Sequence, residues 1–316
     1  MKNEGIIELV MAMFIEFKKI LDNGVSGAIT AVLGEYILVY GGSNFENKYD
    51  RKVHDEYYIY DMEFNLINHG IGKIKPDNGV LVKDAANKIY YMLSNKVYEI
   101  YLDGIDLVEN EILSVDENTS ISFGVKYENR LIFGNDKVYE YDFSEKSLVR
   151  LSDFISSPRS QAVYTLSNEH IYLLGGASNV AYLETYRYDI KNNVWEKLKD
   201  LDFSLLGAAS IKLDENNLLI MGGFDKTEYD KAVINLKDKG YKPIYFDRTR
   251  DSFNWNDKII KYNLLNQTYE VKEISSLSRI CGGVLIKKDE NTYYLVMGEL
   301  KPGLRSSYVY KYEVVK

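Results

Sequence analysis

The chain repeats one short pattern, in which an apolar, strand-like run ends in glycine and a second strand-like run follows after a loop. Paired glycines mark this point at residues 41–42, 175–176 and 222–223. The equivalent positions along the whole chain are Gly41, Met92, Gly134, Gly175, Gly222 and Gly298. Their spacing is 41 to 51 residues, except for a final interval of 76 residues. A regular period of this length indicates a repeat architecture rather than an assortment of hairpins.

Every period but the last holds four strand-like runs, most clearly at residues 162–166, 170–174, 186–189 and from Trp195 onward. The 28 tyrosines agree with this, because tyrosine favours strands. Four strands per unit, with glycines after the second, then a tyrosine and a later tryptophan, resemble the Kelch repeat. The sequence therefore predicts an all-β fold, a six-bladed Kelch-type β-propeller. A β-sandwich would leave the period unexplained.

Two irregularities complete this prediction. The sixth unit has only three strand-like runs, whereas a spare run at residues 14–20 precedes the first unit, so we expect this N-terminal strand to close the last blade. The long final interval holds an insertion at residues 225–252 in the fifth blade, where apolar residues at 229, 232, 233 and 236 have helical spacing. With four prolines and no low-complexity linker, residues 1–316 are expected to form a single domain.

Composition narrows the classes of partner and cofactor. The net charge of −8, with scattered basic residues, argues against a nucleic-acid partner. The apolar segment 9–14 is too short to span a membrane and lacks a cleavage site, so we expect a cytoplasmic protein, or a periplasmic one if a leader was removed. The lone Cys281 and the spacing of the three histidines predict neither a disulfide nor a metal site. A homodimer is left open.

Chain direction places the candidate site residues on one face of the propeller, which we call face A. Loops between the second and third strands of a blade, and loops between blades, share this face. It collects Asn44, Arg159, Gln161, Arg279 and the stretch 298–305, with the insertion beside them. We expect these polar residues to bind a small anionic substrate, although an ordinary solvated charge is an equal alternative for Arg159 and Arg279.

Glu299 and Arg305 flank the turn signal Pro302-Gly303, so they leave neighbouring strands and can project from the same rim. One offers a carboxylate that can move a proton, and the other offers a fixed, fork-shaped positive charge. Because a nearby arginine favours the ionised form of a carboxyl group, we expect Glu299 to be ready to accept a proton. An exposed ion pair of little consequence is the alternative.

Taken together, these residues resemble the Kelch-type N-acetylneuraminate epimerases, or sialic acid mutarotases. The stretch from Gly298 to Arg305 is similar to that family's signature Gly-Glu-x-Lys-Pro-Gly-Leu-Arg, and Pro158-Arg159-Ser160-Gln161 to its Pro-Arg-Asp-Gln. Asn44-Phe45 after the first glycine pair is similar to a Gly-Gly-x-Asn-Phe element. A signature near the C-terminus matches the cyclically permuted branch of the family.

The resemblance implies that Glu299 and Arg305 are the catalytic pair of an enzyme that interconverts the α and β anomers of N-acetylneuraminate. Such a reaction needs no cofactor. The alternative class is a non-catalytic Kelch propeller that binds a glycan or a protein on one face, since propellers host many functions. A copper oxidase on the same fold is disfavoured because the chain lacks paired histidines and a cysteine beside a metal cluster.

Overall fold

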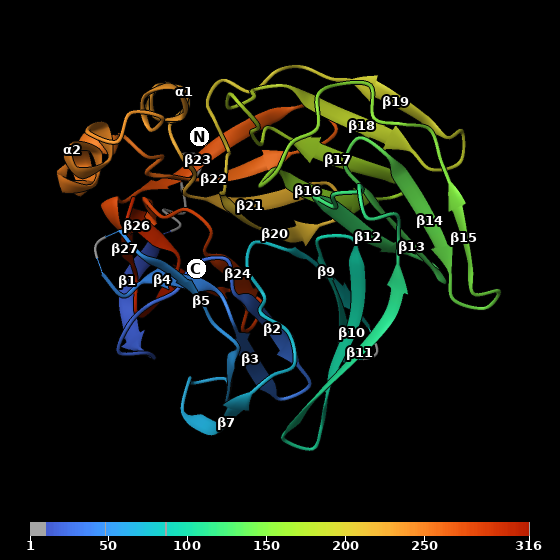
Figure 1. Ribbon diagram of the computed structural model, residues 1–316, viewed down its shortest axis with the longest axis horizontal. Coiled ribbons are helices and arrows are strands. Elements are labelled where there is room, and N and C mark those ends of the chain that lie inside the picture. The colour runs from blue at the N-terminus through green and yellow to red at the C-terminus, as the bar shows by residue number, and fades with distance from the viewer. Residues whose placement is uncertain (1–10, 48, 86, 316) are drawn as a thin grey trace, which may run out of the picture.

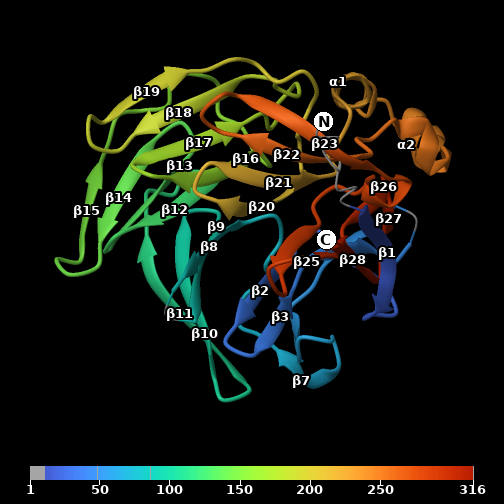
Figure 2. The same ribbon diagram turned by 180° about the vertical axis from the view of Figure 1, so that it is seen from behind.

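The computed structural model describes residues 11–47, 49–85 and 87–315, and within them six four-stranded antiparallel sheets surround a central axis (Figures 1 and 2). The predicted six-bladed, all-β propeller is confirmed. From the inner to the outer strand, the first three blades are β2 (Ile29–Leu33), β3 (Tyr36–Tyr40), β6 (Glu56–Tyr60) and β7 (Leu66–Ile71); β8 (Val80–Asp84), β9 (Lys88–Leu93), β10 (Lys96–Asp103) and β11 (Asp106–Ser114); β12 (Phe123–Tyr127), β13 (Arg130–Gly134), β14 (Val138–Asp142) and β15 (Ser147–Arg150). The last three are β16 (Val163–Ser167), β17 (His170–Leu174), β18 (Thr185–Asp189) and β19 (Val194–Lys197); β20 (Ala209–Asp214), β21 (Asn217–Met221), β22 (Lys258–Asn263) and β23 (Thr268–Ile274); β24 (Val284–Lys287), β25 (Thr292–Val296), β28 (Tyr308–Val315) and β1 (Met11–Lys19).

The apolar faces of these strands explain why the blades pack side by side. Six buried clusters each join two neighbouring blades, including the first and the sixth, so the core runs around the ring. In the cluster between the fifth and sixth blades, for example, Met221 and Ile259 meet Leu285 and Leu295. Burying such side chains stabilises each junction by about 1.5–3 kcal/mol per residue.

The N-terminal strand closes the ring as predicted. β1 pairs with β28 in antiparallel register, and the sheet order is β24, β25, β28, β1. The strand begins three residues earlier than the expected segment 14–20. Phe14 is buried against the rings of Tyr310 and Tyr312, with centroids 5.9 and 6.2 Å away. One blade is therefore built from both ends of the described chain.

The insertion in the fifth blade is helical, as predicted, but it holds more helix than the spacing indicated. α1 (Lys226–Asn235) begins at Asp225, whose side chain accepts a hydrogen bond from the Glu228 amide. α2 (Tyr241–Asp247) and a short 3-10 helix (Arg250–Phe253) follow. The sequence pattern missed α2 because Pro243 resembles a helix breaker, although proline is tolerated in a first turn. None of the helices in the described part of the chain is long and apolar enough to cross a membrane.

A belt of backbone hydrogen bonds links five blades at face A. Its members are Gln161, Gly207, Gly282, Gly27 and Asn78, all with φ between 52° and 73°. Each donates its amide to the preceding member's carbonyl, from Gly207 onward, at 2.8 to 3.1 Å. Glycine adopts this left-handed conformation without strain, and asparagine with little. Because each member directly precedes the inner strand of its blade, the belt fixes where face A residues emerge.

Candidate functional site

A short hairpin on face A carries Glu299 and Arg305. β26 (Glu299–Lys301) pairs with β27 (Leu304–Arg305), and the register sets Glu299 opposite Arg305. Pro302 and Gly303 form the connecting turn, and Gly303 has the positive φ of 82° that a glycine permits. The two side chains form an ion pair, with exposed fractions of 9% for Arg305 and 18% for Glu299. The pair is thus largely buried, unlike an ordinary surface ion pair.

Three sets of contacts hold this hairpin in place. Glu299 exchanges both backbone hydrogen bonds with Cys281, at 2.7 and 3.0 Å. The Gly298 amide donates to the carbonyl of Val25, in the segment that leads into the first blade. Lys301 Nζ donates to the carbonyl oxygens of Phe246 and Arg248, at 2.8 and 2.7 Å, and so ties the hairpin to the end of α2. α1 and α2 accordingly lie at the edge of the ring beside β26 and β27 (Figure 1).

Burial decides the protonation behaviour of Glu299. Its removal from water raises the pKa of the carboxyl above the ordinary glutamate value, and Arg305 and the more distant Arg51 lower it only in part. Arg305 favours the ionised form of Glu299, as expected, but burial outweighs it and the net shift of the pKa is upward. The same carboxylate adds to the raised pKa of the buried Tyr245 phenol on α2 and of the buried Cys281 thiol.

Arg305 is held by the first blade as well as by Glu299. Its guanidinium lies 5.1 Å from the ring centroid of Phe45, and its Nε donates to the Ser43 carbonyl at 3.4 Å. Ser43 and Phe45 belong to β4 (Ser43–Phe45), which pairs with β5 (Arg51–Val53). The cationic group is therefore positioned by two blades, which fixes its orientation relative to the carboxyl.

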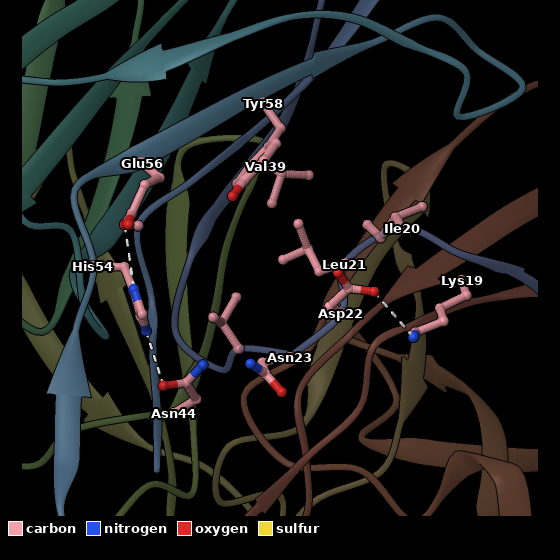
Figure 3. Close-up of a pocket in the computed structure, with 12 residues that line it drawn as sticks. Lys19, Ile20, Leu21, Asp22, Asn23, Val39, Asn44, His54, Glu56 and Tyr58 are labelled. Carbon is pink, nitrogen blue, oxygen red and sulfur yellow. Dashed lines mark hydrogen bonds and ion pairs between the residues drawn. The ribbon is translucent and has the colours of Figure 1, made fainter. Parts of the chain in front are cut away.

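Asn44, an expected substrate ligand, lies between Ser43 and Phe45 on β4, so its side chain leaves the opposite side of the strand. Its Oδ1 lies 2.8 Å from Nε2 of His54, whose Nδ1 is 3.2 Å from a Glu56 carboxylate oxygen. These side chains line a cavity of about 440 Å³ that also includes Asp22 and Asn23 (Figure 3). Asn44 therefore neighbours the two β4 residues that contact Arg305, while its own side chain is directed to His54 rather than to the Glu299–Arg305 pair.

Arg159 is engaged within the protein, so the structure adds nothing in favour of the substrate contact expected of it. The residue is 1% exposed. Its guanidinium donates to the Gly175 carbonyl at 3.1 Å and to Ser156 Oγ at 2.9 Å, and it lies 4.3 Å from the Tyr182 ring centroid. Burial among these groups favours a structural role for this arginine at the entrance to the fourth blade.

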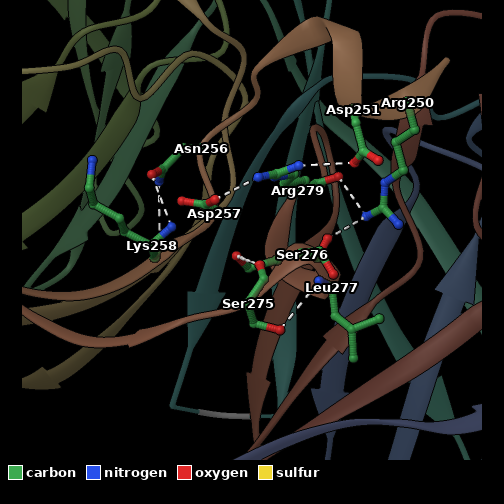
Figure 4. Close-up of polar contacts among 10 residues, drawn as sticks. Arg250, Asp251, Asn256, Asp257, Lys258, Ser275, Ser276, Leu277 and Arg279 are labelled. Carbon is green, nitrogen blue, oxygen red and sulfur yellow. Dashed lines mark hydrogen bonds and ion pairs between the residues drawn. The ribbon is translucent and has the colours of Figure 1, made fainter.

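Arg279 is likewise engaged within the protein. It lies between two carboxylates, 2.9 Å from Asp251 and 2.7 Å from Asp257 (Figure 4). The hydrogen bond with Asp257 is the largest cause of its raised pKa, and Asp251 adds to it. Two acidic partners neutralise its charge, so the structure favours an internal ion-pair network over the expected substrate contact.

Gln161 is a member of the belt and is linked to the pair through Gly207 and Cys281. The side chains of Gln161 and Cys281 both crowd the space beside Gly207, where a Cβ would lie 3.2 Å from Gln161 Oε1 and 2.2 Å from Cys281 Sγ. Cys281 in turn is bridged to Glu299. Gln161 is exposed at this end of the central axis. Of the four expected substrate ligands, it is the one with an exposed side chain near the hairpin.

Arg51 is a residue of this region that the sequence did not single out. It lies on β5, donates Nε to Ser43 Oγ at 3.1 Å, and pairs with Asp77 while keeping 44% of its side chain exposed. Its charge lowers the pKa of Glu299, so it lies within electrostatic range of the carboxyl. The only signal in the sequence is its place in a face A loop, which many charged residues share.

No group of three or more histidine, cysteine, aspartate or glutamate side chains suited to hold a metal ion occurs among residues 11–47, 49–85 and 87–315. The site contains a largely buried acid with a raised pKa, Glu299, a cation paired with it, Arg305, and an aromatic ring in contact with that cation, Phe45. These groups can move a proton and orient an anion.

The sequence matches known proteins over its larger C-terminal part. Residues 118–316 match the family described as N-acetylneuraminate epimerase. An N-acetylneuraminate epimerase of Vibrio cholerae is 30% identical over 195 residues, 56% of this chain and 50% of that protein. One of Vibrio vulnificus is 30% identical over 178 residues, 50% of this chain and 46% of that protein. The chain thus spans about half the length of these curated relatives.

A solved structure, titled Structure of YjhT, shares the fold. It is 18% identical and has a TM-score of 0.55, covering 63% of this chain and 65% of that one. At this identity the likeness supports the fold alone. The family match, by contrast, covers more than half of the chain and includes the hairpin with Glu299 and Arg305. The chain belongs to the N-acetylneuraminate epimerase family.

Proposed function

We propose that this protein interconverts the α and β anomers of N-acetylneuraminate, with Glu299 as the proton carrier and Arg305 as the group that orients the anionic sugar. The observation that carries the proposal is the largely buried Glu299–Arg305 pair, set face to face across a tight hairpin. The family match and the names of the curated relatives support the choice of sugar.

The reaction requires one proton to leave the anomeric hydroxyl and one to reach the ring oxygen. The bond between the anomeric carbon and the ring oxygen then breaks, which leaves a ketone and a hydroxyl group, and the ring closes again on the other face of the ketone. A single carboxylate can take the proton from the anomeric hydroxyl and pass it to the ring oxygen, and the reverse transfer accompanies ring closure. A raised pKa helps, because it brings the acid and base forms of Glu299 closer in free energy at neutral pH.

The positive groups around Glu299 suit an anionic substrate. Arg305 can form charge-assisted hydrogen bonds with the sugar carboxylate or with the developing oxygen charge. Arg51, whose side chain is 44% exposed, is a second cation on the same side of β4. Because ring opening also proceeds unaided in water, general acid–base help of about 10²–10⁴-fold would be sufficient.

The test is anomer exchange followed by one-dimensional proton NMR, starting from the pure β anomer. We expect the protein to speed the exchange and Glu299→Gln to lose about 10²-fold or more of that acceleration, since glutamine keeps the shape but cannot titrate. Binding of the sugar should be largely retained. A wild-type protein that leaves the exchange rate unchanged would rule out this sugar, and a fully active Glu299→Gln would rule out this proton carrier.

A further inference from the structure

The central channel of the propeller is a second cavity, whose wall includes Gln161 at its face A end but neither Glu299 nor Arg305. It has a volume of about 420 Å³ and is lined by the inner strands and by the belt residues at its face A end. The two charged side chains in its wall are Lys83 on β8 and Lys212 on β20, and the wall includes no carboxylate from the part of the chain that the structure describes. This is notable in a protein with a net charge of −8.

The two lysines are not equivalent. Lys212 Nζ donates to the Leu166 carbonyl at 2.9 Å and pairs with Glu215 at 2.8 Å, so its charge is compensated. Lys83 forms no ion pair or hydrogen bond through its ammonium with any residue in the described ranges. Asp84, next to it, pairs instead with Lys126. The strands around the channel reduce the solvation of this unpaired ammonium group, so an anion bound beside it would stabilise it.

Lys83 is exposed to the channel, and strands of the propeller surround it. Its side chain is exposed, and it lines the channel rather than packing into the core. The encircling strands still displace enough solvent that burial lowers the pKa of the Lys83 amine. The nearby Tyr164 cannot serve as a counter-charge, because burial raises the pKa of its phenol to about 12 and its oxygen is bonded to the backbone of Leu81.

The channel wall can also donate hydrogen bonds. β2, β8, β12, β16, β20 and β24 are each the innermost strand of their sheet, so each turns an unpaired backbone edge toward the axis. Ser122 and Ser210 add hydroxyl groups to the wall, and Ser122 Oγ is buried without a hydrogen-bond partner in the described structure. A roomy, polar cavity of this kind holds water or a hydrated ligand rather than a void.

We propose that the central channel binds a small oxyanion, a phosphate or a carboxylate, with Lys83 as its counter-charge. The anion compensates the ammonium group and accepts hydrogen bonds from the wall. This site is distinct from Glu299 and Arg305, so it does not depend on the proposed enzyme activity.

The probe is inorganic phosphate, compared with chloride at equal ionic strength, and the measurements are the thermal unfolding midpoint and equilibrium dialysis of phosphate. We expect saturable phosphate binding by the wild-type protein and at least a 10-fold weaker affinity in Lys83→Met. In the absence of phosphate, Lys83→Met should have a higher unfolding midpoint than wild type, because the channel disfavours the charged form of Lys83. Lys83→Gln provides a polar replacement if methionine perturbs folding.

Lys272→Met is the matched control, because it removes one lysine from the outer strand β23, where Lys272 pairs with Glu270. Comparison with this control variant also separates specific binding from the general stabilising effect of phosphate on proteins. Unchanged phosphate affinity in Lys83→Met, or no saturable binding by the wild-type protein, would overturn the proposal. Competition with N-acetylneuraminate separates the two sources of oxyanion: displacement of phosphate assigns the site to a sugar carboxylate, and no displacement assigns it to an inorganic anion.

Anomer exchange provides an independent readout. We expect Lys83→Met to keep the wild-type exchange rate, and Glu299→Gln to keep the wild-type phosphate affinity. Loss of phosphate binding in Glu299→Gln would show that the phosphate binds at the hairpin rather than in the channel. The channel proposal and the proposed function can therefore fail separately.

Discussion

At the scale of single residues, Glu299 shows how burial and pairing compete for one proton. Arg305 favours the charged carboxylate, but loss of water favours the neutral acid, and burial is the larger of the two effects. The pair is therefore a buried acid whose pKa is raised by the loss of water and lowered in part by a fixed cation. The same balance makes its pH dependence a direct test of the proposed role.

We expect the catalysed exchange rate to show an inflection above the ordinary glutamate pKa of about 4.3. Arg305→Gln should move this inflection to higher pH, because it removes a group that lowers the pKa of Glu299. Protein stability should depend on pH in the corresponding direction. Between the pKa values that Glu299 has in the unfolded and the folded state, the folded state binds more protons, so the free energy of unfolding falls as pH rises through that interval. Glu299→Gln should abolish both effects, and a profile shared by all three proteins would contradict the assignment.

At the scale of elements, the hairpin depends on the insertion that lies beside it. Lys301 donates to two carbonyl oxygens where α2 ends, a place that favours positive charge. Tyr245 and Phe246 of the same helix are buried with Phe253 and Trp255. The insertion therefore supports the hairpin through a charged contact and an aromatic cluster, so we treat Lys301 as a positioning residue.

We expect Lys301→Met to lower the maximal exchange rate by about 10-fold, because each hydrogen bond to a charged group contributes about 1.5–3 kcal/mol. The half-saturating sugar concentration should change less than the rate. Lys242→Met is the matched control, since Lys242 lies on the same helix and contacts the Tyr49 and Phe246 rings instead. Equal rates in both variants would leave Lys301 without a positioning role.

The fold was predictable from the sequence to a greater extent than the site. Apolar runs, glycines and their period depend on local chemistry, so blade number, the closing strand and the helical insertion could all be predicted. Whether Arg159 and Arg279 face a ligand depends instead on partners distant in sequence, such as Gly175 and Asp251, which no spacing reveals. Arg51 was missed for the same reason.

At the scale of the whole molecule, ring closure rests on β1. It supplies the outer strand of the sixth blade, and Phe14 fills the space beside Tyr310 and Tyr312. The ring is therefore held together by pairing between the two ends of the described chain.

We expect Phe14→Ala to lower the free energy of unfolding by about 3–5 kcal/mol, the usual cost of removing a buried phenylalanine. Met13→Ala is the control, because Met13 is 42% exposed on the same strand. Chemical denaturation followed by tyrosine fluorescence measures both. If the two variants unfold at the same denaturant concentration, β1 packs too loosely to close the ring.

The belt at face A has a consequence for how the molecule opens. Each of its amides belongs to one blade, while the carbonyl that accepts the hydrogen bond belongs to the next. If one of the three middle blades of the belt frays alone, it therefore breaks bonds to both of its neighbours. The amide hydrogens of Gly27, Gly207 and Gly282 should therefore exchange with solvent only when adjoining blades separate together, and hydrogen exchange measures this.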